Sequence, residues 1–159
     1  SRPRPASSGR TYRLTICGDG EDAKELRDLA DALKLLHKVT LLGYRRDVYA
    51  IMQSADVLVL PSWYEGMPNV LLEALAIGIP SIVSGIPSHR DLIGDTRCAM
   101  TFNPNSPAEL AARISEFFAN PSCATEMVRA GWNIAEAHAP LAMAGRYRDF
   151  YLDMTDGRS

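Results

Sequence analysis

Two glutamates, Glu65 and Glu73, are the residues of this sequence best suited to bind a ligand. Glu65 falls in a turn directly after an apolar run at residues 56–60, which is typical of a buried strand. Glu73 falls about one turn inside the helix that we predict from Pro68 onward. Two carboxylates around a helix start suit a ligand with a phosphate in the middle and hydroxyl-bearing sugars on either side.

The backbone at this helix start is the candidate phosphate-binding element. Pro68 is predicted at the first helical position, where its missing N–H group would have had no partner. The next amides, those of Asn69, Val70 and Leu71, have no acceptor inside a helix and point outward. Gly66 allows the backbone to approach a ligand closely. Together with the helix dipole, these groups form a ready anion site.

The elements that must position these groups alternate along the chain. We predict strands at residues 12–17, 39–42, 56–60, 81–84 and 99–102, and helical patterns between them. A capping box, Ser106-Pro107-Ala108-Glu109, opens a further helix, and two more helices are predicted up to about residue 137 and at 140–154. This order predicts an α/β fold: a Rossmann-like parallel sheet flanked by helices, with a helical C-terminal extension.

Ligands bind such sheets beyond the carboxyl ends of the strands. Three turns are predicted at that edge: residues 18–20, 43–46 and 62–69. We expect them to converge on one site.

The first of these turns also matches a dinucleotide fingerprint, because Gly18, Gly20 and Ala23 fit the pattern Gly-x-Gly-x-x-Ala after a strand. However, Asp19, Glu21 and Asp22 would place three negative charges beside the pyrophosphate. This repulsion disfavours a nicotinamide-dependent dehydrogenase.

Composition narrows the remaining classes of function. The chain has 159 residues, 47% of them hydrophobic, and a net charge of −2, which gives no sign of nucleic-acid binding. We expect a basic, flexible tail at residues 1–10 and a ligand-binding domain at 11–155. Three cysteines without metal or redox spacing indicate a cytoplasmic protein, and the basic tail is compatible with peripheral membrane association.

The segment Glu65-Gly66-Met67-Pro68-Asn69-Val70, followed by Glu73-Ala74-Leu75-Ala76 and Gly78-Ile79-Pro80, resembles a known signature. It is similar to the Glu-x7-Glu motif of retaining, nucleotide-sugar-dependent glycosyltransferases with the GT-B fold. The likeness extends over about residues 12–120. It implies the C-terminal, donor-binding half of a two-domain hexosyltransferase of polysaccharide or glycolipid biosynthesis.

By this resemblance, Glu65 is the catalytic residue and contacts the hydroxyls of the transferred sugar. The amides near Met67, Asn69 and Val70 hold the distal phosphate, and Glu73 holds the ribose hydroxyls. The remaining donor-binding residues shape the cleft or face the nucleobase: Gly18, Gly20, Tyr44, Arg45, Gly66 and Pro68.

Two further residues follow the fourth predicted strand, in a segment expected to be a loop. His89 is a candidate to reach the sugar, and Asp91 stands where relatives often have a glutamate. The donor is a nucleoside-diphosphate sugar, and we expect no metal and no other cofactor. No Asp-x-Asp pair and no cluster of His and Cys at ligand spacing is present.

The sequence also departs from the family. The arginine and lysine that cradle the diphosphate in relatives have no counterpart, nor does the acceptor domain, so we expect a chain truncated at its N-terminus. A glycan or lipid-linked acceptor would bind through the missing domain, and an unpaired sheet edge would favour self-association. A catalytically inactive, stand-alone nucleotide-binding or interaction module is the alternative.

Overall fold

The computed structural model describes residues 11–139, which divide into two compact units at residues 11–51 and 52–139. The predicted tail at 1–10 and the predicted helix at 140–154 lie outside the described residues. Helix α2 (Val48–Gln53) contains the point at which the chain passes from one unit to the other.

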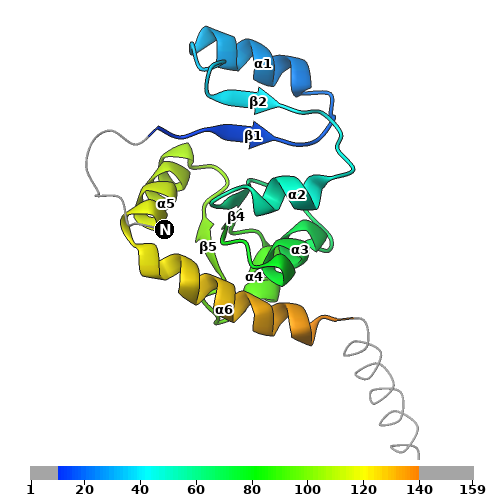
Figure 1. Cartoon of the computed structure of the whole chain (residues 1–159), viewed down its shortest axis with the longest axis vertical. Coiled ribbons are helices and arrows are strands. Elements are labelled where there is room, and N and C mark those ends of the chain that lie inside the picture. Colours follow the sequence, from blue (N-terminus) through cyan, green and yellow to red (C-terminus); the bar gives the residue numbers. More distant parts are fainter. Residues whose placement is uncertain (1–10, 140–159) are drawn as a thin grey trace, which may run out of the picture. The chain divides into compact units, whose positions relative to one another are not determined.

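The smaller unit is one β-α-β crossover. Strand β1 (Leu14–Ile16) pairs in parallel with β2 (Val39–Leu41), and α1 (Ala23–Ala32) connects them and contacts β2 (Figure 1). Within residues 11–51, Ala30 is the only fully buried residue. This unit therefore has little core of its own.

The larger unit contains a three-stranded parallel sheet in the order β3-β4-β5. Each strand is followed by a helix, so the strands are joined by crossovers that place helices on the faces of the sheet. The bounds of these elements are β3 Leu58–Leu60, α3 Asn69–Ile77, β4 Ser81–Ser84, α4 Pro87–Ile93, β5 Ala99–Phe102, α5 Pro107–Ala119 and α6 Pro121–Ala137.

Strand β4 is the centre of this sheet, since it pairs with a neighbour on both sides and all its residues are buried. Successive side chains of a strand point to opposite faces. Val83 accordingly joins a cluster with α3 and α4, whereas Ile82 joins a second cluster with Phe117 of α5. Helix α6 contributes to both clusters and packs mainly against α3.

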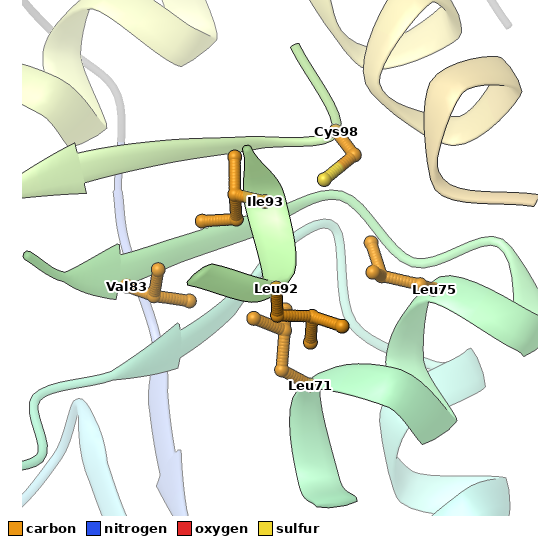
Figure 2. Close-up of a cluster of buried hydrophobic side chains, with 6 residues drawn as sticks. All are labelled: Leu71, Leu75, Val83, Leu92, Ile93 and Cys98. Atoms are coloured by element: carbon orange, nitrogen blue, oxygen red, sulfur yellow. The ribbon is translucent and has the colours of Figure 1, made fainter. Parts of the chain in front are cut away.

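The first of these clusters fixes α3 and α4 against the sheet. Leu71 and Leu75 of α3 belong to one buried cluster with Leu92 of α4 and Val83 of β4 (Figure 2). Cys98, directly before β5, completes the cluster, and burial raises the pKa of its thiol. The helices that follow β3 and β4 both pack in this cluster. The loops at the carboxyl ends of these strands are therefore fixed at both of their ends.

The expected α/β class with parallel strands flanked by helices is confirmed, although the hydrogen-bonded strands form two sheets. The predicted capping box is half formed. Ser106 Oγ accepts from the amide of Glu109 at 3.2 Å, but the Glu109 carboxylate accepts from the amide of Asn103 at 3.0 Å.

Two local predictions were wrong. Helix α3 begins at Asn69, and Pro68 is its N-cap instead of its first residue, because the Pro68 carbonyl accepts the first helical hydrogen bond. The segment containing His89 and Asp91 is helix α4 and not a loop. Pro87 at its start is the sequence signal for this helix.

None of the helices in residues 11–139 combines the length and the apolar character needed to cross a bilayer.

Candidate functional site

The carboxyl ends of β3 and β4 bring together the polar residues of the larger unit. The two strands pair in register, with Leu60 opposite Val83, so the chain leaves both at the same edge of the sheet. The loop after β3 carries Glu65, and α4 after β4 carries His89. Their side chains meet with His89 Nε2 3.5 Å from Glu65 Oε2.

Two serines complete a ring of polar contacts around this pair. Ser62 Oγ donates a short hydrogen bond to Glu65 Oε1. Ser84 Oγ donates to the carbonyl of Ser62 at 2.6 Å, and His89 Nδ1 lies 2.8 Å from the carbonyl of Ser84. A carboxylate in the loop is thereby tied to the central strand of the sheet.

The ring is buried on one side and open on the other. His89 has no exposed surface, whereas the Glu65 side chain is 24% exposed. A ligand on the surface therefore meets Glu65 before His89. Within the described chain, His89 Nε2 and Ser88 Oγ are buried side-chain atoms that have no hydrogen-bond partner.

At the start of α3, the folded backbone engages one of the amides that were predicted to bind phosphate. The backbone at Pro68, with φ −80° and ψ 64°, forms an inverse γ-turn in which the amide of Asn69 donates to the carbonyl of Met67 at 2.9 Å. The Asn69 amide is thus engaged. The amides of Val70 and Leu71 have no backbone acceptor in the described part of the chain, but Leu71 has no exposed surface, so Val70 is the residue of this pair that a ligand can reach.

Glu73 lies one turn into α3, as predicted, and is half-buried. Its carboxylate forms no hydrogen bond or ion pair with any residue of 11–139. The carboxylate is therefore available to a ligand. Gly66 and Met67, in the loop between Glu65 and α3, are exposed.

The smaller unit brings the other two predicted turns together. The amide of Gly18, after β1, donates to the carbonyl of Gly43, after β2, at 2.9 Å. Gly18 has φ 138°, a conformation that side chains disfavour, which explains a glycine there. Gly20 lies two residues further in the same turn. Tyr44 directly follows Gly43 and is 73% exposed.

Arg45 has a partner within its own turn. Its guanidinium binds both carboxylate oxygens of Asp47, at 2.8 and 2.7 Å. This hydrogen-bonded pair raises the pKa of Arg45 and lowers the pKa of Asp47. Any contact of Arg45 with a nucleobase would compete with Asp47 or use the backbone.

The structure therefore assembles the candidate residues in two groups. Glu65, Glu73, His89 and the start of α3 belong to the larger unit, and Gly18, Gly20, Tyr44 and Arg45 belong to the smaller one. Convergence of all three turns stays a prediction. Asp91 is exposed on α4 and contacts none of the described side chains through a hydrogen bond or ion pair.

Ser62 and Ser84 are the site residues that sequence reasoning missed. A serine at the carboxyl end of a predicted strand was the available signal for Ser84, since a hydroxyl buried in a sheet needs a partner. Within residues 11–139, no group of three or more His, Cys, Asp or Glu side chains could hold a metal ion.

Parallel strands with helical crossovers, and a carboxylate beside a helix start at their carboxyl ends, define an α/β protein of the kind that binds ligands beyond the carboxyl ends of its strands. Comparison with known proteins gives its family. Residues 5–133 match the model of the family described as Glycosyl transferases group 1. The chain belongs to this family.

Two curated relatives illustrate the likeness. One is the UDP-Gal:alpha-D-GlcNAc-diphosphoundecaprenol alpha-1,3-galactosyltransferase of Escherichia coli, to which the chain is 42% identical over 81 residues. This alignment covers 50% of this chain and 21% of the relative. The other is the Vi polysaccharide biosynthesis protein VipC/TviE of Salmonella typhi, to which the chain is 40% identical over 70 residues. This alignment covers 44% of this chain and 12% of the relative. The aligned parts are thus about a fifth or less of the length of these relatives.

Among solved structures, HepE of Anabaena in complex with UDP and glucose superposes with a TM-score of 0.80 at 20% identity. The superposition covers 94% of this chain and 42% of HepE. This likeness establishes the fold, which is that of part of a GT-B glycosyltransferase.

Proposed function

We propose that this chain is the donor-binding part of a retaining glycosyltransferase that uses a nucleoside-diphosphate hexose. The observation that carries the proposal is the arrangement at the start of α3. A tethered carboxylate, Glu65, precedes the helix, two amides without backbone acceptors lie at its first turn, and Glu73 follows one turn later.

Each part suits one portion of such a donor. The amide of the exposed Val70, with the positive end of the helix dipole, would bind the distal phosphate and stabilise the charge of the leaving diphosphate. Glu65 would accept hydrogen bonds from sugar hydroxyls, and Glu73 from the ribose. Carboxylates form strong hydrogen bonds with hydroxyl donors.

The two glutamates would not act as a glycosidase pair, because they serve different portions of the donor instead of flanking one scissile bond. Retention is proposed from the resemblance to the Glu-x7-Glu signature. The anomeric configuration of the product, measured by proton NMR, tests it directly.

Relatives support the choice of donor and acceptor. The name of the Escherichia coli relative specifies a UDP-galactose donor and a diphosphoundecaprenol-linked acceptor, and HepE was solved with UDP and glucose. We therefore propose a UDP-hexose as donor and a glycan or lipid-linked sugar as acceptor, bound through a domain outside this chain. The names of the relatives favour an enzyme over the stand-alone module.

The first prediction separates the roles of the two glutamates. Glu73→Gln should weaken binding of UDP and UDP-glucose alike, by roughly 10-fold or more, because one charge-assisted hydrogen bond contributes about 1.5–3 kcal/mol. Glu65→Gln should weaken only UDP-glucose. Saturation-transfer NMR at millimolar ligand measures both affinities on the 159-residue chain.

Glu136→Gln is the matched control, since Glu136 is an exposed glutamate on α6. It should change neither affinity. Equal losses on both ligands for both site variants would refute the division of roles. No UDP binding at millimolar concentration would refute the donor site itself.

A further inference from the structure

The least expected feature of the larger unit is a buried histidine whose Nε2 has no hydrogen-bond partner among the described residues. His89 has no exposed surface, and a buried polar atom without a partner is costly. Opposite Nε2 lies the carboxylate oxygen Glu65 Oε2, at 3.5 Å. This distance is just beyond that of a good hydrogen bond.

The orientation of the imidazole is set from the side opposite Glu65. His89 Nδ1 lies 2.8 Å from the carbonyl oxygen of Ser84. A carbonyl can only accept, so Nδ1 carries a proton and donates it. Ser84 belongs to β4, the central strand, and this bond therefore fixes the ring to a rigid element and aims Nε2 at the carboxylate.

The carboxylate is held from its other oxygen as well. Ser62 donates to Glu65 Oε1, and Ser62 is itself joined to β4 because Ser84 Oγ donates to its carbonyl at 2.6 Å. The four residues make a closed ring of polar contacts, in which only the contact between Nε2 and Oε2 is longer than a hydrogen bond. A small shift of the Glu65 carboxylate would close it.

We propose that His89 is a positioning residue that holds Glu65 through a hydrogen bond between Nε2 and Oε2 when the donor sugar binds. The proposal rests on the proposed function, in which Glu65 receives the sugar hydroxyls. The bond requires one proton between the two atoms, carried by either partner. His89 acts through Glu65 and does not contact the sugar, because a ligand at the surface meets Glu65 first.

This role differs from the sequence expectation that His89 reaches the sugar itself. It also explains why α4 has a histidine at this position, although the helix otherwise packs on the core. An aliphatic side chain could not form a hydrogen bond with Glu65. When Nε2 binds the Glu65 carboxylate, the carboxylate has one preferred orientation. The sugar then binds without the entropic cost of ordering that side chain.

Two substitutions separate the two nitrogens of His89. Asparagine in His89→Asn places a donor near the Nδ1 position, so it preserves the bond to Ser84 but leaves nothing opposite Glu65. Glutamine in His89→Gln is long enough to place its amide near the Nε2 position. Ser88→Ala is the matched control, since Ser88 Oγ is the neighbouring buried atom without a partner in the described chain.

The measurement is the ratio of the dissociation constants of UDP-glucose and UDP, determined by saturation-transfer NMR for each variant. We expect His89→Asn to raise this ratio about 10-fold, His89→Gln to restore part of the loss, and Ser88→Ala to leave the ratio unchanged. A merely structural role of His89 would weaken both ligands together. An unchanged ratio in His89→Asn would overturn the proposal.

A measurement without ligand decides the Glu65–His89 contact by itself. Because Nε2 already lies 3.5 Å from Oε2 without ligand, Glu65→Gln should move the Nε2 resonance of His89 in the ¹⁵N-histidine-labelled chain and leave its Nδ1 resonance nearly in place. An Nε2 resonance that does not move would overturn the proposal, even if His89→Asn failed to fold. Absence of UDP binding in the unsubstituted chain would instead refute the proposed function, which keeps the two failures distinct.

Discussion

At Glu65, the two carboxylate oxygens face partners of different kinds. Oε1 accepts from a serine in the same loop, whereas Oε2 faces a histidine that is fixed to the central strand. One oxygen thus has a hydrogen-bond partner in its own loop, and the other lies 3.5 Å from a residue that the fold brings near it. This arrangement leaves the exposed part of the carboxylate free for hydroxyl donors.

Arg45 and Asp47 provide a residue-scale prediction about pH. Their hydrogen-bonded pair lowers the pKa of the Asp47 carboxyl, so its contribution to stability is present above the ordinary aspartate pKa. The contribution is lost as the pH falls through the lowered folded value. Arg45→Gln should return the Asp47 pKa toward its ordinary value, as measured by ¹³C NMR titration of the carboxyl group.

Arg46→Gln is the control for this titration, because Arg46 is the adjacent exposed arginine and does not contribute to the lowered pKa of Asp47. It should leave the Asp47 pKa in place. An Asp47 titration that Arg45→Gln does not move would show that the pair is absent in solution.

Among the helices, α3 is the element on which the site most depends, and α6 holds it in place. The two helices pack closely at Gly131, which is buried on α6. A Cβ atom there would lie 2.9 Å from Leu75 Cδ2 and 3.4 Å from Leu75 Cβ. Leu75 is in the core cluster, so it has little room to move away.

We therefore predict that Gly131→Ala destabilises the larger unit. Overpacking costs about 1–3 kcal/mol, and the better helix propensity of alanine offsets about 0.5–1 kcal/mol of it. Urea unfolding followed by circular dichroism measures the change in free energy.

The same substitution in a Leu75→Ala background should be neutral or stabilising, because the clash is then gone. An equal loss of stability in both backgrounds would mean that the two helices do not meet at Gly131 as described.

At the scale of the whole molecule, the two units differ in how much core they possess. The larger unit has two buried clusters on the faces of its sheet. The smaller unit exposes many large apolar side chains, among them Leu14 at 49%, Leu29 at 54% and Leu33 at 58%. Apolar surface that stays in contact with water contributes nothing to folding.

This difference predicts unequal local stability. Backbone amides of β1 and β2 should exchange with deuterium earlier than those of β4, which is paired on both sides and buried. Hydrogen-exchange mass spectrometry on peptides covering these strands measures the order. Equal protection of β1 and β4 would show that the two units open together.

The sequence pattern was sufficient for β4 and β5, whose predicted and observed bounds agree, because each is a short uncharged segment followed by a turn residue, Gly85 or Asn103. It overestimated β1, since Tyr12 and Cys17 extend the apolar pattern beyond the three residues that pair. It missed α4, because a seven-residue helix with Pro, Ser, His, Arg and Asp offers little apolar pattern. Local capping signals at Ser106 and Pro107 were sufficient to locate the start of α5.

By itself, the sequence determined the α/β class and the position of Glu65 and Glu73 around a helix start, because both follow from local spacing. Only the tertiary structure placed His89 and Ser84 behind Glu65. These residues are far from Glu65 along the chain and meet it because β3 and β4 pair in parallel. The γ-turn that engages the Asn69 amide was also decided by the folded backbone, since it depends on the dihedral angles of Pro68 and not on residue types alone.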